Sequence, residues 1–209
     1  MDGLIGKKLG MTQVWDTAGH YVPVTVLEVG PCPVVQVKQQ AVDGYEAVQV
    51  GFWPQKPQRL TKAVRARFEK AGVPPCRELR EFALETGDSV KVGDTLDVGI
   101  FEGVKLVDVM SISKGRGFAG AVRRFRMAGG PHGHGGHSKR RIGSIGERNL
   151  PGWVRKGKPM PGHMGAVRVT ARNLAVVALR KDDNVLLVRG AVPGPPGALV
   201  IVTKALKKT

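Results

Sequence analysis

Residues 127–165 read MAGGPHGHGGHSKRRIGSIGERNLPGWVRKGKPMPGHMG, and this stretch separates two parts of the chain with a different character. It is rich in glycine and histidine, and it shows no sustained apolar period of 2 or 3.6 residues, so it predicts neither strand nor helix. Loops longer than roughly 12–15 residues are uncommon in compact domains, where they serve a function or are disordered. We therefore expect a stretch that cannot fold alone.

A local excess of positive charge surrounds this stretch. Residues 110–181 contain 16 Lys and Arg but one carboxylate, Glu147, which accounts for +15 of the chain's formal net charge of +16. The rest of the chain, with 17 basic and 16 acidic residues, is nearly neutral. Because the excess is confined to one region, it points to a polyanionic partner rather than to general solubility. RNA is the partner that we expect.

The composition narrows the class of protein. With 209 residues, 42% of them hydrophobic, the chain can bury a core in one large or two small domains. Aromatic residues make up 5%, which argues against a sheet that stacks RNA bases. Cys32 and Cys76 form no C-x-x-C pair and read as reduced thiols, with a single disulfide as the alternative. No signal-peptide pattern and no run near ~18 apolar residues is present, so we expect a soluble, cytoplasmic protein.

Short valine-rich runs on both sides of the basic stretch predict strands. Asp43-Gly44 separates two of these runs and indicates a hairpin. The expected strands cover residues 12–15, 22–29, 34–42, 45–50, 79–84, 95–100, 105–110, 166–179, 184–192 and 198–203. We expect a mainly β fold, a closed antiparallel β-barrel built from both ends of the chain, because closure removes strand edges that could pair with other chains.

Two excursions leave the expected barrel. Thr61 can cap a helix over Lys62–Ala71 that ends at Gly72, and its basic surface is expected to play at most a minor part in RNA contact. The expected barrel core therefore covers residues 1–112 and 166–209, with a small helical insertion at about 55–76. The second excursion is a long basic Gly/His-rich extension, residues 113–165.

The run Gly115–Gly120 (GRGFAG) matches G-x-G-x-x-G. A dinucleotide site would also need a βαβ unit and an acidic residue about 20 positions further on, and the sequence shows neither. We favour a glycine turn that brings backbone N–H groups near phosphates, with Lys114 and Arg116 supplying charge. A turn that contacts nothing is the alternative.

Histidines recur within the basic stretch at His132, His134 and His137, with His163 further on. The spacing H-x-H-x-x-H could bind zinc, but no cysteine or carboxylate completes a common structural set. We favour imidazoles that stack on or hydrogen-bond to RNA. A solvated loop is the alternative when no partner is present.

Dense basic clusters and one aromatic residue complete the candidate RNA-binding set. Short basic runs also occur as localisation signals or plain surface, but the near absence of carboxylates around these favours phosphate contact. Trp153 suits stacking on an unpaired base or, alternatively, local hydrophobic anchoring. The candidates are Lys114, Arg116, Arg123, Arg124, Arg126, His132, His134, His137, Lys139, Arg140, Arg141, Arg148, Asn149, Trp153, Arg155, Lys156, Lys158, His163 and Arg168. Ser144 lacks the G-x-S-x-G spacing, and we find no catalytic set, cofactor site or small-molecule site.

Many motifs, in order, resemble one family. They are Gly3–Thr12 (GLIGKKLGMT), Phe101, Asp108, Ser111, Ser113, Gly115-Arg116-Gly117, Gly120, Arg124, Gly143–Gly146, Pro151-Gly152, Lys156–Lys158, Gly162–Gly165, Asn184–Val188 and Gly190–Gly194. Over essentially the whole chain, the sequence resembles the bacterial form of large-subunit ribosomal protein three.

The resemblance implies a translation-protein-like barrel on the surface of the large subunit and an extension that threads into large-subunit rRNA. It also implies early rRNA binding during assembly, neighbouring large-subunit proteins, and a tip around Glu147–Arg155 that approaches the peptidyl-transferase centre. Asn149 departs from the family pattern, since bacterial relatives can carry a methylated glutamine there.

Three classes of function are consistent with parts of the sequence. A structural rRNA-binding protein without catalysis fits the neutral barrel, since a general nucleic-acid binder would gain from charge spread over its fold. A free-standing nonspecific nucleic-acid-binding protein or RNA chaperone predicts binding to many RNAs and DNAs. A nucleotide-dependent enzyme predicts that the isolated protein binds a mononucleotide or dinucleotide.

Overall fold

A computed structural model describes residues 1–16, 19–84 and 89–206. The chain forms two compact units. The barrel unit comprises Met1–Ile112 and Arg168–Thr209, and the insertion unit comprises Ser113–Val167. The insertion unit begins and ends at neighbouring strands, since Ile112 lies opposite Arg168 in an antiparallel pair.

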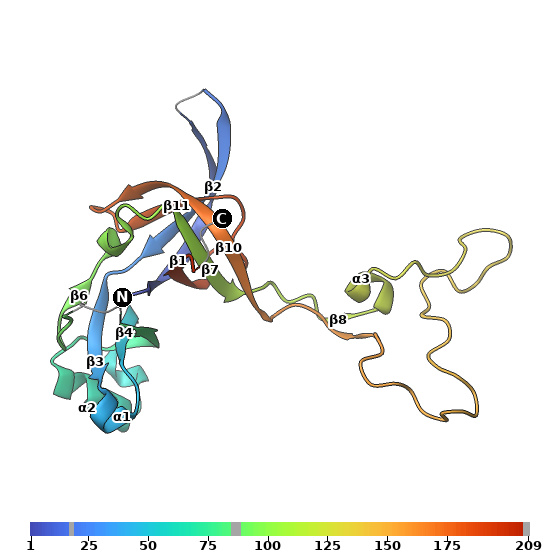
Figure 1. Ribbon diagram of the computed structural model, residues 1–209, viewed down its shortest axis with the longest axis horizontal. Coiled ribbons are helices and arrows are strands. Elements are labelled where there is room, and N and C mark those ends of the chain that lie inside the picture. Colours follow the sequence, from blue (N-terminus) through green and yellow to red (C-terminus); the bar gives the residue numbers. More distant parts are fainter. Residues whose placement is uncertain (17–18, 85–88, 207–209) are drawn as a thin grey trace. The chain divides into compact units, whose positions relative to one another are not determined.

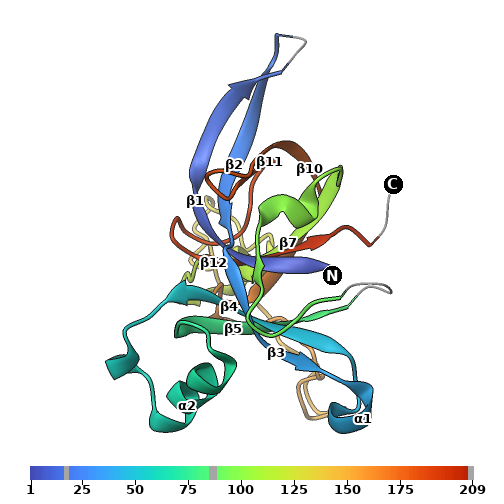
Figure 2. The same cartoon turned by 90° about the vertical axis from the view of Figure 1, so that its left-hand side faces the viewer.

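Six strands of the barrel unit close into an antiparallel barrel (Figure 1 and Figure 2). The strands are β1 (Gly3–Trp15), β2 (Tyr21–Val29), β7 (Leu106–Ile112), β10 (Arg168–Arg180), β11 (Val185–Arg189) and β12 (Leu199–Lys204). Their order around the barrel is β1-β12-β7-β10-β11-β2. The first and last strands of the chain are therefore neighbours, which confirms the closed barrel expected from both ends of the sequence.

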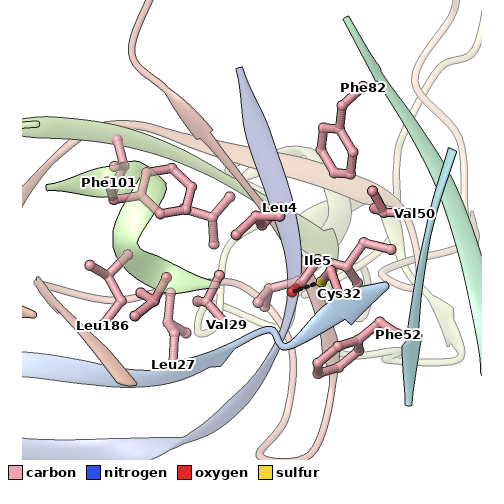
Figure 3. Close-up of a cluster of buried hydrophobic side chains, with 14 of the residues drawn as sticks. Leu4, Ile5, Leu27, Val29, Cys32, Val50, Phe52, Phe82, Phe101 and Leu186 are labelled. Atoms are coloured by element: carbon pink, nitrogen blue, oxygen red, sulfur yellow. Dashed lines mark hydrogen bonds between the residues drawn. The ribbon is translucent and has the colours of Figure 1, made fainter. Parts of the chain in front are cut away.

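Alternating valines, leucines and isoleucines fill the core. In β7 every second side chain, including Val107 and Val109, is buried. Figure 3 shows Leu27, Leu186 and Phe101 facing one another inside the barrel. Each fully buried side chain of this size stabilises the fold by roughly 1.5–3 kcal/mol relative to exposure.

Glycines let β1 approach its neighbours closely. A Cβ at Gly6 would collide with the carbonyl oxygen of Glu28, and a Cβ at Gly3 would collide with the carbonyl oxygen of Val202. The sequence prediction placed a strand only from residue 12 onward, so it missed the first nine residues of β1. Glycines and lysines interrupt the apolar alternation there, although the backbone pairs with both β12 and β2.

A second antiparallel sheet lies between β2 and β7 in the chain. It contains β3 (Cys32–Lys38), β4 (Ala47–Pro54), β5 (Cys76–Ala83) and β6 (Thr95–Leu96), in the order β5-β4-β3-β6. The helix α2 (Lys62–Ala71) lies next to it (Figure 2) and buries Phe68 against Val35, Val73 and Cys76. The sequence pattern predicted these strands but not that they form a sheet separate from the barrel.

The helix prediction was confirmed at both ends of α2, where Gly72 adopts the left-handed C-cap conformation. Thr61 occupies the N-cap position, but its side chain makes no capping hydrogen bond. A 3₁₀ turn, η1 (Pro57–Arg59), precedes the helix.

The ends of several strands were predicted wrongly, and two of the expected strands run into helical turns. The strand expected over 34–42 ends at Lys38, because α1 (Gln40–Asp43) makes the hairpin turn and the Asp43 carboxylate accepts a hydrogen bond from the Gln39 N–H. The strand expected over 95–100 stops at Leu96, and η2 (Val98–Phe101) follows. Its buried residues, Val98 and Phe101, are three positions apart, a helical rather than a strand spacing.

Both cysteines are free and buried. This agrees with the interpretation as reduced thiols and not with the alternative of a single disulfide. Within the described part of the chain, no helix is long and apolar enough to cross a membrane.

Candidate nucleic-acid interface

The insertion unit starts with a narrow two-stranded stem. The Ser113 N–H donates to the Val167 carbonyl at 2.9 Å, and further along the Arg116 N–H donates to the Met164 carbonyl at 2.8 Å. The short strands β8 (Phe118–Ala119) and β9 (Gly162–His163) continue the pairing. Gly165 permits the close approach, because a Cβ there would collide with the Lys114 carbonyl oxygen.

Gly115–Gly120, the run that matches G-x-G-x-x-G, lies in this stem. These residues form one side of the stem and lead into the short helix α3 (Ala121–Phe125), so no βαβ unit surrounds them. The dinucleotide alternative therefore lacks its structural context. Lys114 and Arg116 are both exposed on this stem.

Arg124 ties α3 to the returning chain. Its Nη1 donates to the Met160 carbonyl at 2.8 Å, and a Cβ at Gly162 would meet the same guanidinium at 2.8 Å. The side chain is half-buried, whereas Arg123 and Arg126 are exposed. Arg124 thus has a structural role in addition to the RNA contact expected for it.

The histidine run forms a closed loop. The Gly130 N–H donates to the Lys139 carbonyl at 3.1 Å, and a Cβ at Gly129 would collide with that carbonyl oxygen. His132, His134 and His137 are exposed on the loop. Among the described residues, no group of three or more His, Cys, Asp or Glu side chains could hold a metal ion, so these histidines are not gathered as ligands.

A basic segment from the end of the closed loop lies beside the start of α3. A cleft of about 430 Å³ is lined by Gly120 and Ala121 on one side and by Arg140 and Arg141 on the other. The Arg141 N–H donates to the Ser138 carbonyl at 3.0 Å, which fixes the turn that carries this cluster. Arg140 and Arg141 therefore lie beside the start of α3.

A second cleft lies within residues 144–158, which we call the far end of the insertion unit. It measures about 400 Å³, and its lining includes Ile145, Trp153, Arg155 and Lys158. Glu147 also lines it and bonds to Arg155 Nη2 at 3.2 Å. The Trp153 side chain remains 58% exposed, so it is available for stacking.

The insertion unit has almost no core of its own. All its residues are described, and only Ala119 and Ala121 are buried. It carries 12 Lys and Arg but one carboxylate, and that carboxylate is paired with Arg155. The remaining cations consequently have no carboxylate partner within the unit.

Sequence reasoning missed the exposed apolar side chains that lie among these cations. Leu150 is 85% exposed and Phe118 is 80% exposed, and Val167 and Phe125 are also exposed. A signal was present, since large apolar residues in a stretch without periodicity have no core position to fill. These side chains are therefore not part of a core within the insertion unit.

The structure distributes the candidate residues unevenly. Arg168 begins β10 and belongs to the barrel unit, while the others lie in the insertion unit. The stem holds Lys114, Arg116 and His163; α3 and its flank hold Arg123, Arg124 and Arg126; the closed loop and its end hold His132, His134, His137, Lys139, Arg140 and Arg141; the far end holds Arg148, Asn149, Trp153, Arg155, Lys156 and Lys158.

These features define a class: a β-barrel protein whose inserted unit is cationic and lacks a core. The family model described as "Ribosomal protein L3" matches residues 83–186. The large ribosomal subunit protein uL3 of Brachyspira hyodysenteriae is 46% identical, over 100% of this chain and 96% of its own length. The uL3 protein of Deinococcus radiodurans is 47% identical, over 99% of this chain and 96% of its own length. The uL3 protein of Koribacter versatilis is 49% identical, over 99% of this chain and 88% of its own length. The chain belongs to the ribosomal protein L3 family.

Proposed function

We propose that this protein is a structural constituent of the large ribosomal subunit that binds large-subunit rRNA through residues 113–165. The observation that supports this most directly is the insertion unit, with 12 cationic side chains, one carboxylate and two buried residues. Such a segment cannot offset its ordering entropy with its own hydrophobic burial, so a polyanionic partner must stabilise it.

The mechanism is electrostatic and steric. Arginine and lysine side chains neutralise phosphates where RNA helices converge and release condensed counterions. Exposed side chains such as Trp153 and Leu150 pack against bases or fill grooves, which fixes how the helices pack. No catalytic step is involved.

In the particle, residues 113–165 act as a long extension into the rRNA, and Glu147–Arg155 form the tip that reaches toward the peptidyl-transferase centre. The protein binds early in assembly, in the cytoplasm, and neighbouring large-subunit proteins pack on the barrel. The similarity to relatives named large ribosomal subunit protein uL3, over nearly their full length, supports this role.

Incorporation into particles tests the proposal. A tagged chain is added to large-subunit rRNA and the other large-subunit proteins, and the sedimenting particles are assayed for the tag. We expect K139Q/R140Q/R141Q to reduce incorporation strongly, because three phosphate contacts beside α3 are lost. The matched control K62Q/R67Q/K70Q removes equal charge from the exposed side of α2 and should incorporate almost normally.

Equal incorporation of both variants and the parent chain would contradict the proposed role of the insertion unit. A free-standing nonspecific binder or RNA chaperone, the alternative function, would sediment with rRNA in the absence of competitor but would be removed from the particles by excess tRNA.

A further inference from the structure

Trp53 lies near the end of β4 with two cations over its ring. Lys7 Nζ, from β1, lies 5.6 Å from the ring centroid, and Arg77 Cζ, from β5, lies 5.1 Å from it. These distances are in the range of cation–π attraction. Three strands distant in the sequence therefore bring an aromatic ring and two positive charges together, outside the insertion unit.

The backbone at Trp53 is in an uncommon conformation. Its φ is +69°, in the left-handed region that bulky side chains rarely adopt. Hydrogen-bonded neighbours hold it there, since Phe52 pairs with Glu78, Pro54 pairs with Cys76, and the Gln55 N–H donates to the Pro75 carbonyl. Glycine would fit this backbone without strain, so the tryptophan ring is the feature that needs an explanation.

The two cations have no carboxylate partner in residues 1–16, 19–84 and 89–206. In the described residues neither Lys7 nor Arg77 forms an ion pair, although Glu28 lies opposite Lys7 in the β1–β2 register. Arg77 is exposed, and Lys56, on the same connection out of β4, is exposed as well. The ring itself is only partly buried, where it packs against the edge of the main core.

We propose that Trp53, Lys7 and Arg77 form a second RNA contact, specific for an unpaired nucleotide. The exposed Arg77 side chain moves off the Trp53 ring so that the base stacks in its place, and Arg77 and Lys7 then hold the adjoining phosphate. An aromatic face beside cations is the combination that binds single-stranded nucleotides. The contact operates on the barrel unit and does not require residues 113–165.

This inference rests on the proposed function, since it assumes that the chain binds large-subunit rRNA. The two fail in different ways. If the parent chain does not retain rRNA on a filter, the proposed function fails; if the chain binds but Trp53 senses nothing, only the nucleotide contact fails.

Tryptophan fluorescence tests the contact directly. The chain has three tryptophans, and W15F/W153F leaves Trp53 as the sole emitter. This double variant is titrated with a large-subunit rRNA transcript while filter retention measures binding in parallel. We expect Trp53 emission to be quenched at the same rRNA concentrations at which the protein is retained.

Further substitutions in this background separate stacking from charge. W53L keeps an apolar side chain at the core edge and should weaken binding about tenfold, whereas W53F keeps a ring and should weaken it less. K7Q/R77Q should lower the log–log salt slope by about two. K62Q/R67Q removes equal charge from α2 and should leave the Trp53 quenching unchanged. Circular dichroism confirms that each variant is folded.

Unchanged Trp53 emission at saturating retention would show that the ring only seals the core edge, and would overturn the proposal. Equal affinity of folded W53L and the W15F/W153F chain would overturn it as well.

Discussion

Lys8 is a charged side chain inside the fold. It is 7% exposed, and its Nζ donates to the Val192 carbonyl at 2.7 Å and to the Gly194 carbonyl at 3.1 Å. The cation thus fixes the turn between β11 and β12 against β1. A buried charge is tolerated only when hydrogen bonds of this kind replace its hydration.

We predict that K8M lowers the free energy of unfolding by about 2–3 kcal/mol, because hydrogen bonds to a charged group are lost and two carbonyls stay unsatisfied. Urea denaturation measures the change. The control K105M alters an exposed lysine and should shift stability by less than about 0.5 kcal/mol. Equal effects of the two substitutions would contradict the structural role of Lys8.

The thiol of Cys32 is buried, and burial suppresses its ionisation. Its Sγ donates to the Ile5 carbonyl at 3.4 Å, and burial raises the pKa of the thiol from 9.0 to about 12. Burial also raises the pKa of Cys76. Because the thiolate is the reactive form, both thiols are protected in the folded chain.

We predict that a C76S chain reacts with a thiol reagent at pH 8 only after denaturant is added. The unfolded thiol ionises near pH 9 while the folded one keeps its proton to about pH 12, so Cys32 lowers the free energy of unfolding as pH rises through that window. Rapid labelling of the native chain, with an unchanged circular dichroism spectrum, would refute this account of Cys32.

At the scale of single residues, the sequence predicted the exposed cationic and aromatic side chains of the insertion unit, but it did not predict the burial or backbone conformation of some residues in the barrel unit. Trp153 and the cations of the insertion unit are exposed, as their polar surroundings indicated, apart from the half-buried Arg124. Neither the burial of Lys8 nor the left-handed backbone of Trp53 has a local signal, because strands distant in the chain impose both.

At the scale of elements, β1 depends on where its glycines stand. Gly6 faces the Glu28 carbonyl so closely that a side chain does not fit, whereas a Cβ at Gly10 would meet no atom within 4 Å. The two glycines share one strand but differ in the space around them. They therefore form a matched pair for substitution.

We predict that G6A destabilises the protein by about 2 kcal/mol or more, because the added methyl forces β1 and β2 apart. G10A should leave stability unchanged or raise it by up to about 1 kcal/mol, since alanine restricts the unfolded chain. Thermal unfolding of both variants checks this. A neutral G6A would mean that β1 does not approach β2 as described.

Elements with strong local signals were predictable, and those fixed by tertiary pairing were not. The helix α2 has a glycine stop and clear composition, and both its ends were predicted. The first half of β1 has no alternation, so only its pairing with β12 and β2 defines it as a strand. The end of β6 was misjudged because burial of Phe101 favours a 3₁₀ turn.

At the scale of the molecule, all six strands of the closed barrel lie outside the insertion unit. Ser113 and Val167 are joined at the base of the stem, and the pairing continues to Ala119 and Gly162. We predict that replacing residues 120–161 with a four-residue Gly-Ser turn preserves the barrel. Far-UV circular dichroism and a cooperative melt near that of the parent chain would show this; a molten or unfolded variant would show that the boundary is misplaced.

The division of the chain into a β-barrel and a basic insertion was predictable, because net charge and apolar periodicity change at the same places in the sequence. The closed barrel followed from valine-rich runs at both ends, while the separate four-stranded sheet did not, since strand periodicity does not specify which strands pair. The positions of cations within the insertion unit depend on glycine contacts such as Gly129 with the Lys139 carbonyl, which join residues ten positions apart without any local pattern.

Equilibrium binding to large-subunit rRNA, in excess tRNA competitor and across a salt series, tests the central claim most directly. The whole chain is compared with the variant that lacks residues 120–161. We predict competitor-resistant binding with a steep salt dependence, and a much shallower dependence for the variant, which has lost ten Lys and Arg. Binding abolished by tRNA, or the same slope for both chains, would contradict a specific rRNA protein that acts through its insertion.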